Sequence, residues 1–245
     1  MRLQPVFLAC LVVAPAVLLG IELFHPAGFT AHPGMFEFLS QPQPYDPQYH
    51  ALAYPGPGWW FRLHMIQTPL VGFVAVGLWL LVGRVERADG LLASVLGCVS
   101  RGATFVFLIY YTALDAIGGF GLARSIINTE RLAAAGQLTA DQVAGIKLLL
   151  DTNWQDRWIG GVGSFISLTG SWAIFVATVA GALALLLARK APWPALILLV
   201  GFGWELQTSH ASPHGPIAFG LLIVAALWIW WTTPARPSAR APAVA

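Results

Sequence analysis

The stretch WWFRLHMIQTPLVGFVAVGLWLLV, residues 59–82, decides the class of this protein. After its first turns it carries no charged side chain, and it has the length of a helix that crosses the hydrocarbon core of a bilayer, which needs roughly 20 apolar residues. It begins with Trp59 and Trp60, and tryptophan favours the headgroup level of a membrane. The stretch therefore predicts a transmembrane helix that carries a polar residue, His64, near its start.

Five further apolar runs follow the same pattern, each bounded by charged residues, proline or tryptophan. Together the runs predict an all-α, polytopic bundle of six transmembrane helices, at about 6–24, 59–82, 98–122, 159–187, 192–207 and 216–231. The run at 192–207 is the weakest, because it is short and contains Glu205. If 192–231 formed a broken re-entrant hairpin instead, five crossings would remain and the two termini would lie on opposite sides.

The composition agrees with a membrane protein and excludes several other classes. The 245 residues are 57% hydrophobic and 10% charged, whereas soluble domains average about 25% charged residues. The formal net charge of +2 provides no basic surface for a phosphate backbone, so we expect no nucleic-acid partner. The two cysteines are too few for a disulfide scaffold or for a cysteine-ligated zinc or iron–sulfur site.

Positively charged residues predict the orientation, because short cytoplasmic loops collect lysine and arginine. With six crossings, most of the 13 Lys and Arg residues fall on the face that holds both termini. We therefore expect an N-in, C-in protein of the cell membrane, with residues 1–231 as one transmembrane domain and 232–245 as a disordered cytoplasmic tail. Residues 1–20 also resemble a secretory signal, but their apolar run continues beyond the usual length of a signal core.

Two segments between the predicted helices are expected on the outer face. The first, residues 26–58, is a long loop rich in proline, which favours extended backbone and turns. In the second, Thr139 and Gln142 have the spacing of a capping box. Apolar residues at helical spacing follow as far as Leu150. We expect a short helix here that lies on the outer membrane surface.

All six histidines fall on the outer side, or in the outer leaflet, of this topology: His25, His32, His50, His64, His210 and His214. With a rise of 1.5 Å per helical residue, Glu22, His64, Asp115 and Glu205 fall at one depth on four different helices. Ionisable side chains at this depth are costly unless they pair, bind something or line a wet cavity. The layer therefore predicts a functional site that faces outward.

The residue types in this layer favour a metal site. Glu22 and His25 are three residues apart, a spacing that recurs in the carboxylate-bridged metal sites of helical bundles. Mixed histidine and carboxylate ligands suit zinc, iron or manganese better than calcium. The expected metal ligands are Glu22, His25, His64, His210 and His214, and the expected catalytic acid and base are Asp115 and Glu205.

These residues support one leading hypothesis of function and leave two alternatives open. The leading hypothesis is a membrane metalloenzyme, a hydrolase or an oxidoreductase, that acts on a lipid or another apolar substrate in the bilayer. A haem b electron-transfer protein would instead use two of the histidines as axial ligands. A transporter, an accessory subunit bound to another membrane protein or to a second copy, or a scaffold would use the polar residues to conduct protons or to join helices.

The spacing of His210 and His214, with His64 on the second predicted helix and Asp115 on the third, is similar to the seven-helix superfamily of ceramidases and adiponectin-receptor hydrolases. This resemblance implies a zinc ion held by three histidines beside an Asp and a Ser, and cleavage of lipid amides. The chain departs from the pattern in having six predicted helices, Trp60 in place of a serine one turn before His64, and prolines around the histidine pair. The resemblance covers four residues, so we do not assign the chain to the superfamily.

Overall fold

The computed structural model describes residues 4–29, 32 and 34–232, which form helices and no strand. The helices are α1 (Gln4–Leu8), α2 (Ala14–Glu22), α3 (Met35–Ser40), α4 (Pro57–Val82), α5 (Leu91–Leu114), α6 (Leu122–Ala134), α7 (Ala140–Trp154), α8 (Phe165–Leu187), α9 (Trp193–Thr208) and α10 (His214–Thr232). A π-helical segment, Ala9–Val13, joins α1 to α2, and a second, η4 (Asp115–Gly121), joins α5 to α6. The all-α class expected from the sequence is confirmed.

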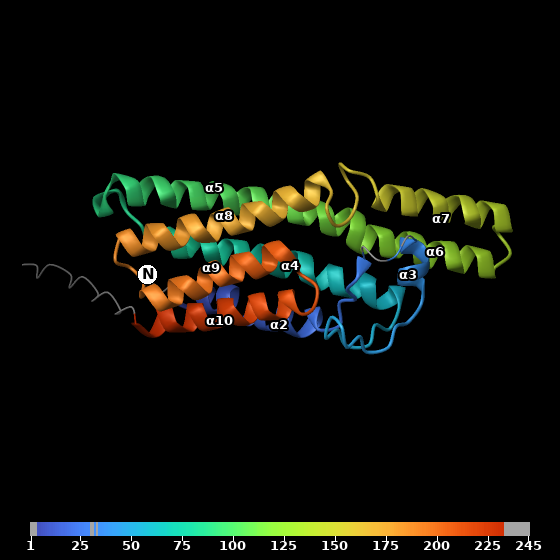
Figure 1. Cartoon of the computed structure of the whole chain (residues 1–245), viewed down its shortest axis with the longest axis horizontal. Helices are drawn as coiled ribbons and strands as arrows, with labels where there is room; N and C mark the ends of the chain where they lie inside the picture. Colours follow the sequence, from blue (N-terminus) through green and yellow to red (C-terminus); the bar gives the residue numbers. More distant parts are fainter. Residues whose placement is uncertain (1–3, 30–31, 33, 233–245) are drawn as a thin grey trace, which may run out of the picture.

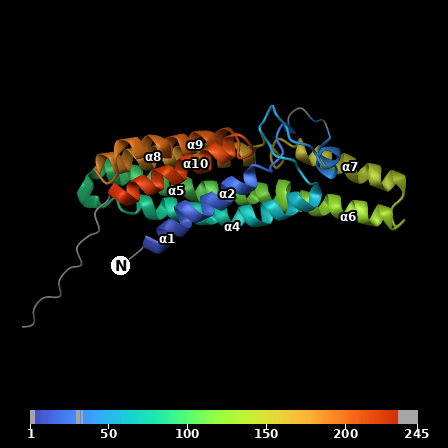
Figure 2. The same cartoon turned by 90° about the horizontal axis from the view of Figure 1, so that it is seen from below.

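The helices form two parts along the long axis of the molecule. Figure 1 shows α2, α4, α5, α8, α9 and α10 side by side in a bundle, with α6, α7 and the short α3 beyond one end of it. Figure 2 shows the same division in the perpendicular view. The bundle has its own apolar core, with fully buried side chains such as Leu11, Phe202 and Phe219 from three different elements. The two parts meet where η4 continues into α6.

Five helical segments are long and apolar enough to cross a membrane: Pro5–Glu22, Pro57–Val82, Leu91–Ala134, Phe165–Leu187 and His214–Thr232. The sixth expected crossing, at 192–207, corresponds to α9. This helix has 16 residues, a length of about 24 Å, which is less than the roughly 30 Å of a bilayer core. It nevertheless contacts both α8 and α10 and runs between them in the bundle (Figure 1).

The third expected helix is much longer than the apolar run that predicted it. We expected residues 98–122, whereas α5, η4 and α6 form one helical segment of 44 residues from Leu91 to Ala134. This segment is about 66 Å long, twice the thickness of a bilayer core. It continues past the end of the apolar run because no proline or glycine interrupts residues 122–135, and it ends before Gly136, whose φ is +68°.

The capping box predicted for the next helix is confirmed. Thr139 Oγ1 accepts a hydrogen bond from the backbone nitrogen of Gln142 at 3.2 Å, and Gln142 Oε1 accepts one from the backbone nitrogen of Thr139 at 2.8 Å. We expected this helix to lie flat on the membrane surface, but α7 runs alongside α6, along the long axis of the molecule (Figure 1). The two helices therefore form a hairpin that extends beyond the bundle.

A second apolar core connects this hairpin to the rest of the protein. It consists of Met35, Phe36, Phe38, Leu39, Tyr54, Trp60, Leu122, Ala123 and Ile126, which come from α3, the loop after it, the start of α4 and the start of α6. The backbone nitrogen of Phe36 also donates to Asp151 Oδ1 of α7 at 2.9 Å. The segment expected as a Pro-rich loop, 26–58, thus contains α3 and packs against the hairpin. Residues 233–245, the main part of the expected tail, lie outside the described residues.

The packing of α9 against α8 makes a testable prediction about two glycines. A Cβ atom on Gly203 of α9 would lie 1.9 Å from Thr178 Oγ1 of α8, whereas one on Gly102 of α5 would meet nothing within 4 Å. Because alanine favours a helix over glycine by up to about 1 kcal/mol at either position, the difference between the two variants reports the packing. We expect Gly203→Ala to lower the thermal midpoint in detergent and Gly102→Ala to maintain or raise it. Equal midpoints would contradict this packing.

Candidate metal centre

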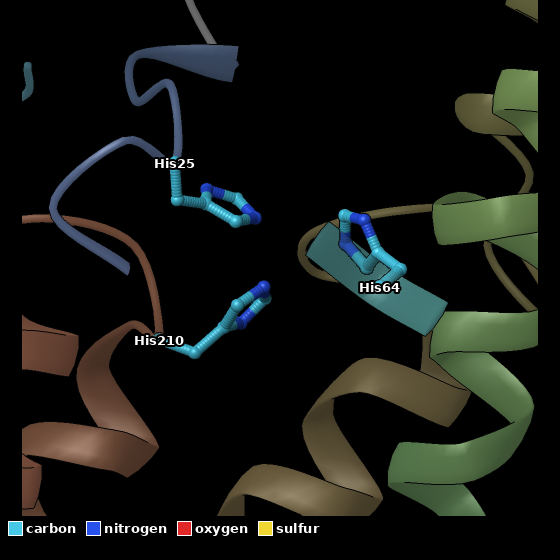
Figure 3. Close-up of side chains that lie close together, drawn as sticks. All are labelled: His25, His64 and His210. Atoms are coloured by element: carbon cyan, nitrogen blue, oxygen red, sulfur yellow. The ribbon is translucent and has the colours of Figure 1, made fainter. Parts of the chain in front are cut away.

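Three histidines from distant parts of the sequence meet at the end of the bundle that adjoins η4. His25 follows α2, His64 lies in α4, and His210 lies in the link between α9 and α10. One possible ligand nitrogen of each lies within 4.8 Å of those of the other two. Figure 3 shows the three imidazoles facing one another from three separate elements. The three side chains therefore lie close enough to hold one metal ion.

His25 is placed by the end of α2. The carbonyl of Glu22 accepts a hydrogen bond from the backbone nitrogen of His25 at 3.1 Å, and Pro26 disfavours continuation of the helix at the residue before it. Nδ1 of His25 lies 2.8 Å from the carbonyl oxygen of Pro26. Because a carbonyl can only accept, Nδ1 carries the proton. Nε2 is then an unprotonated buried nitrogen with no hydrogen-bond partner among the described residues, and an unprotonated nitrogen is what a metal ligand requires.

His64 is held by the turn of α4 that precedes it. Its Nδ1 lies 2.8 Å from the carbonyl oxygen of Trp60, so Nδ1 again donates and Nε2 is left unprotonated. The ring of Trp60 packs on the imidazole with the two ring centroids 4.3 Å apart. Gly119 of η4 also lies against the ring, since a Cβ at this position would clash with Cδ2 and Cγ of His64. The ring therefore needs a glycine at this position of the π-helical segment.

His210 lies where the chain leaves the helical path after α9. Its ring centroid is 4.7 Å from that of His25 and 5.7 Å from that of Tyr111. Burial lowers the pKa of His210 to about 4. Burial, and after it the neighbouring His210 and His64, hold the pKa of His25 well below its usual value. Both imidazoles are therefore neutral at pH 7, with lone pairs available for a metal.

The three imidazoles line a cavity of ≈ 80 Å³, which has room for several water molecules. Most of its lining is apolar, and it includes Phe107 and Leu114 of α5 and Ile174 of α8. Hydroxyl-bearing residues, Ser167 and Ser171 of α8, also face it. A metal ion held by the histidines would therefore adjoin a space that accepts water or an apolar group.

Asp115 lines the same cavity and is only 2% exposed. It is the first residue of η4, and π-helical segments inside α-helices are frequent at functional sites. Thr68 Oγ1 lies 2.8 Å from Asp115 Oδ2 and also 2.8 Å from the carbonyl oxygen of His64. A hydroxyl has one proton, so Thr68 donates either to Asp115, which is then a carboxylate, or to the carbonyl, in which case Asp115 must be protonated and donate to Thr68. Asp115 is thus placed to hold or release a proton beside the histidines.

Glu22 is fully buried but is not one of the three residues whose ligand atoms converge. Its Oε1 accepts a hydrogen bond from Gln67 Nε2 at 2.7 Å, and the same nitrogen donates to the hydroxyl of Tyr111 at 2.5 Å. Its Oε2 has no hydrogen-bond partner in the part of the chain that the structure describes. Tyr111 itself lines the cavity, whereas Glu22 and Gln67 each lie one helical turn from a residue that lines it, His25 and His64 respectively.

The other predicted site residues lie apart from the three histidines. His214 Nδ1 is 2.7 Å from Glu205 Oε2, so the two form a pair with each other, and neither lines the cavity. The four-residue spacing of His210 and His214 does not place them on one helix face, because the chain leaves the helix at Thr208 and α10 begins at His214. The histidine pair that carried the resemblance to the ceramidase superfamily is therefore divided in the structure.

Several residues that support the site were not identified as functional from the sequence. Trp60, expected as an anchor at the membrane surface, is 2% exposed, packs on His25 and His64, and donates from Nε1 to the carbonyl of Gly118 at 3.0 Å. Its spacing of four residues from His64 is the signal that could have assigned it to the site. Gly119 offered no comparable signal, because its role depends on the approach of another helix.

Comparison with known proteins adds no assignment: no family model matches the chain, and neither a curated protein nor a solved structure is significantly similar to it.

The neutral state of the buried imidazoles predicts how the stability of the metal-free protein depends on pH. In the unfolded chain a histidine binds a proton below about pH 6.5, whereas folded His210 stays neutral down to about pH 4. The unfolded state therefore binds more protons in this range, and stability falls as the pH falls from 6.5 to 4. His210→Gln should lose less stability than the wild type over this range, as measured by thermal midpoints in detergent. Parallel pH curves for the two proteins would contradict a neutral buried His210.

Proposed function

We propose that this chain is an integral membrane metalloprotein in which His25, His64 and His210 bind one transition-metal ion. One observation carries the proposal: the ring nitrogens of the three histidines converge, and the Nδ1 atoms of His25 and His64 are already engaged by backbone carbonyls. Second-shell hydrogen bonds of this kind fix the tautomer and the ring orientation of metal-bound histidines. Three histidines packed for structure alone would not need two unprotonated Nε2 atoms pointed at a shared space.

The ligand set favours zinc. Tetrahedral zinc with Zn–N bonds of 2.0–2.1 Å holds its ligand nitrogens about 3.4 Å apart. In the structure the possible ligand nitrogens lie within 4.8 Å of one another. A shift of about 1 Å in each side chain would bring them to the separation that zinc requires. Iron and manganese sites usually include carboxylate ligands, and the three converging residues are all histidines. Three histidines also leave one tetrahedral position open, as in catalytic zinc sites.

The packing around the histidines favours a single ion over haem b. A haem held by two histidines has one imidazole on each face of its macrocycle. The two imidazoles must therefore be separated by a gap that the macrocycle can fill. Here the ring centroid of His25 lies 4.7 Å from that of His210 and 5.6 Å from that of His64. Trp60 covers His25 and His64 with centroids at 4.8 and 4.3 Å. A macrocycle would have to displace Trp60 or the third histidine.

The site supports a hydrolase that acts on an amphipathic or apolar substrate. A zinc ion in such a site lowers the pKa of a bound water towards 7 and makes it a nucleophile at neutral pH. Asp115 faces the same cavity and is placed to accept or donate the proton. The apolar lining would accept the hydrocarbon part of a substrate, and the hydroxyls of Ser167 and Ser171 would contact its polar part.

We further propose that the bundle crosses the cell membrane six times, with α9 as the sixth crossing and both termini in the cytoplasm. Helix α9 packs between α8 and α10, which are both long and apolar enough to cross a membrane. This position supports the count of six crossings. The histidines then face the outside, beneath the α6–α7 hairpin.

Metal content tests the proposed site most simply. Purified wild-type protein, loaded with zinc and desalted, should retain about one equivalent by elemental analysis and show no Soret band. His25→Ala, His64→Ala and His210→Ala should each lose the metal. A chelator should lower the thermal midpoint of the wild type but not that of these variants, because a ligand stabilises only the state that binds it.

His214→Ala and His32→Ala serve as matched controls for the metal-content measurement. His214 pairs with Glu205, and His32 packs on Phe38 with ring centroids 4.2 Å apart, so both variants should keep the metal. If the three cluster variants bound as much zinc as the wild type, the histidines would instead form a structural network. A strong Soret band would favour the haem alternative.

Labelling of introduced cysteines tests the six-crossing topology. In a variant whose Cys10 and Cys98 are replaced by serine, cysteines at Gln43 and Gln137 should react with a membrane-impermeant reagent in intact cells, and one at Ser238 should react only after lysis. Labelling of position 238 from outside would contradict the proposed topology of six crossings with both termini in the cytoplasm.

A further inference from the structure

Two buried carboxyl groups lie next to the three histidines. Glu22 is 0% exposed, and its carbonyl accepts the backbone hydrogen bond of His25. Asp115 is 2% exposed and lines the cavity that the three imidazoles line. A connected set of contacts joins Glu22 to the cavity: Gln67 bonds both Glu22 and Tyr111, and the ring of Tyr111 packs near that of His210. The two carboxyls therefore belong to the immediate surroundings of the metal centre.

Neither carboxyl has a cationic partner among residues 4–29, 32 and 34–232. The hydrogen-bond partner of Glu22 is the amide of Gln67, and that of Asp115 is the hydroxyl of Thr68. Salt bridges in this part of the chain lie elsewhere, for example at Glu37, Asp89 and Glu205. Within the same described residues, Glu22 Oε2 has no hydrogen-bond partner. Buried carboxylates without a counter-charge are costly, and two close together also repel each other.

The two carboxyls lack a positively charged partner, whereas the three histidines lack the negative charge that would balance a bound cation. As neutral ligands they contribute no charge, so a divalent ion bound by them alone would leave two uncompensated positive charges in a buried site. From this complementarity we propose that Glu22 and Asp115 supply the two negative charges that balance a bound divalent cation, and that they thereby make the site prefer divalent over monovalent metal ions. This inference rests on the metal site proposed above and assigns to the two carboxyls a role outside the ligand set.

The contacts of the two carboxyls suit a charge-balancing role better than direct ligation. The hydrogen bond from Gln67 holds Glu22 Oε1 one turn below the ligand His25, and the hydrogen bond with Thr68 holds Asp115 beside the ligand His64. A carboxylate that is held near the ion but does not bind it directly attracts the ion through its charge alone. Because this attraction is proportional to the charge of the ion, a dication gains twice as much from it as a monocation.

The isosteric variants Glu22→Gln and Asp115→Asn test this role. Chelator-competition titrations with Zn²⁺, and with Cu⁺ under anaerobic reducing conditions, would give two dissociation constants for each purified protein. We expect each variant to bind Zn²⁺ about 10–100-fold more weakly, which is the usual cost of losing an outer-shell partner. The affinity for Cu⁺ should fall by only about 3–10-fold, because a monocation loses half as much free energy, so that the preference for Zn²⁺ over Cu⁺ decreases by about 3–10-fold in each variant.

Glu205→Gln is the matched control, because Glu205 is a partly buried carboxylate paired with His214 outside the cavity. It should leave both dissociation constants unchanged. If Glu22→Gln and Asp115→Asn weakened Zn²⁺ and Cu⁺ equally, the carboxyls would only position the ligands, and charge balancing would be overturned. Unchanged Zn²⁺ affinity would overturn it as well. A wild type that binds neither ion would instead refute the metal site itself, so the two failures are distinguishable.

Discussion

A buried imidazole has two ring nitrogens. In the described part of the chain, His25 and His64 each use only one of the two in a hydrogen bond, and the candidate metal centre depends on this arrangement. His25 and His64 each donate from Nδ1 to a backbone carbonyl close by in the sequence, at 2.8 Å. This local hydrogen bond fixes the proton on Nδ1 and directs an unprotonated Nε2 towards the partner residues. Two such nitrogens, brought close to His210, form a set of lone pairs that could hold a metal ion.

The fold brings these nitrogens together at three places where a regular helix is interrupted. α2 ends at Glu22, so that His25 turns inward. The chain leaves the helix between α9 and α10, which places His210 opposite. The π-helical segment η4 brings Gly119 against the ring of His64. The second apolar core, through Trp60, and the hairpin residue Trp154, which lines the cavity, then cover the histidines from outside the bundle.

The sequence predicts the helical class and most of the long helices, because apolar runs of about 20 residues are strong, local signals. The helical hairpin was not predicted, since the continuation of α5 into α6 depends on the absence of helix breakers and on packing against α3. The site was predicted in part. The expected depth placed Glu22, His64, Asp115 and Glu205 in one layer, of which His64 and Asp115 line the cavity and Glu205 pairs with His214 away from it. The expected ligands included His25, His64 and His210, whose ring nitrogens lie close together. The separation of His214 from His210 depends on where α9 ends, and the spacing alone does not contain that information.

X-ray absorption spectroscopy of the zinc-loaded protein tests the central claim, a mononuclear site with three histidine ligands, most directly. The account predicts a first shell of about three nitrogens and one further light atom at 2.0–2.1 Å, with the multiple-scattering pattern of imidazole, and loss of one imidazole in His210→Ala. A first shell that contains sulfur, or one made only of oxygens without imidazole scattering, would contradict it.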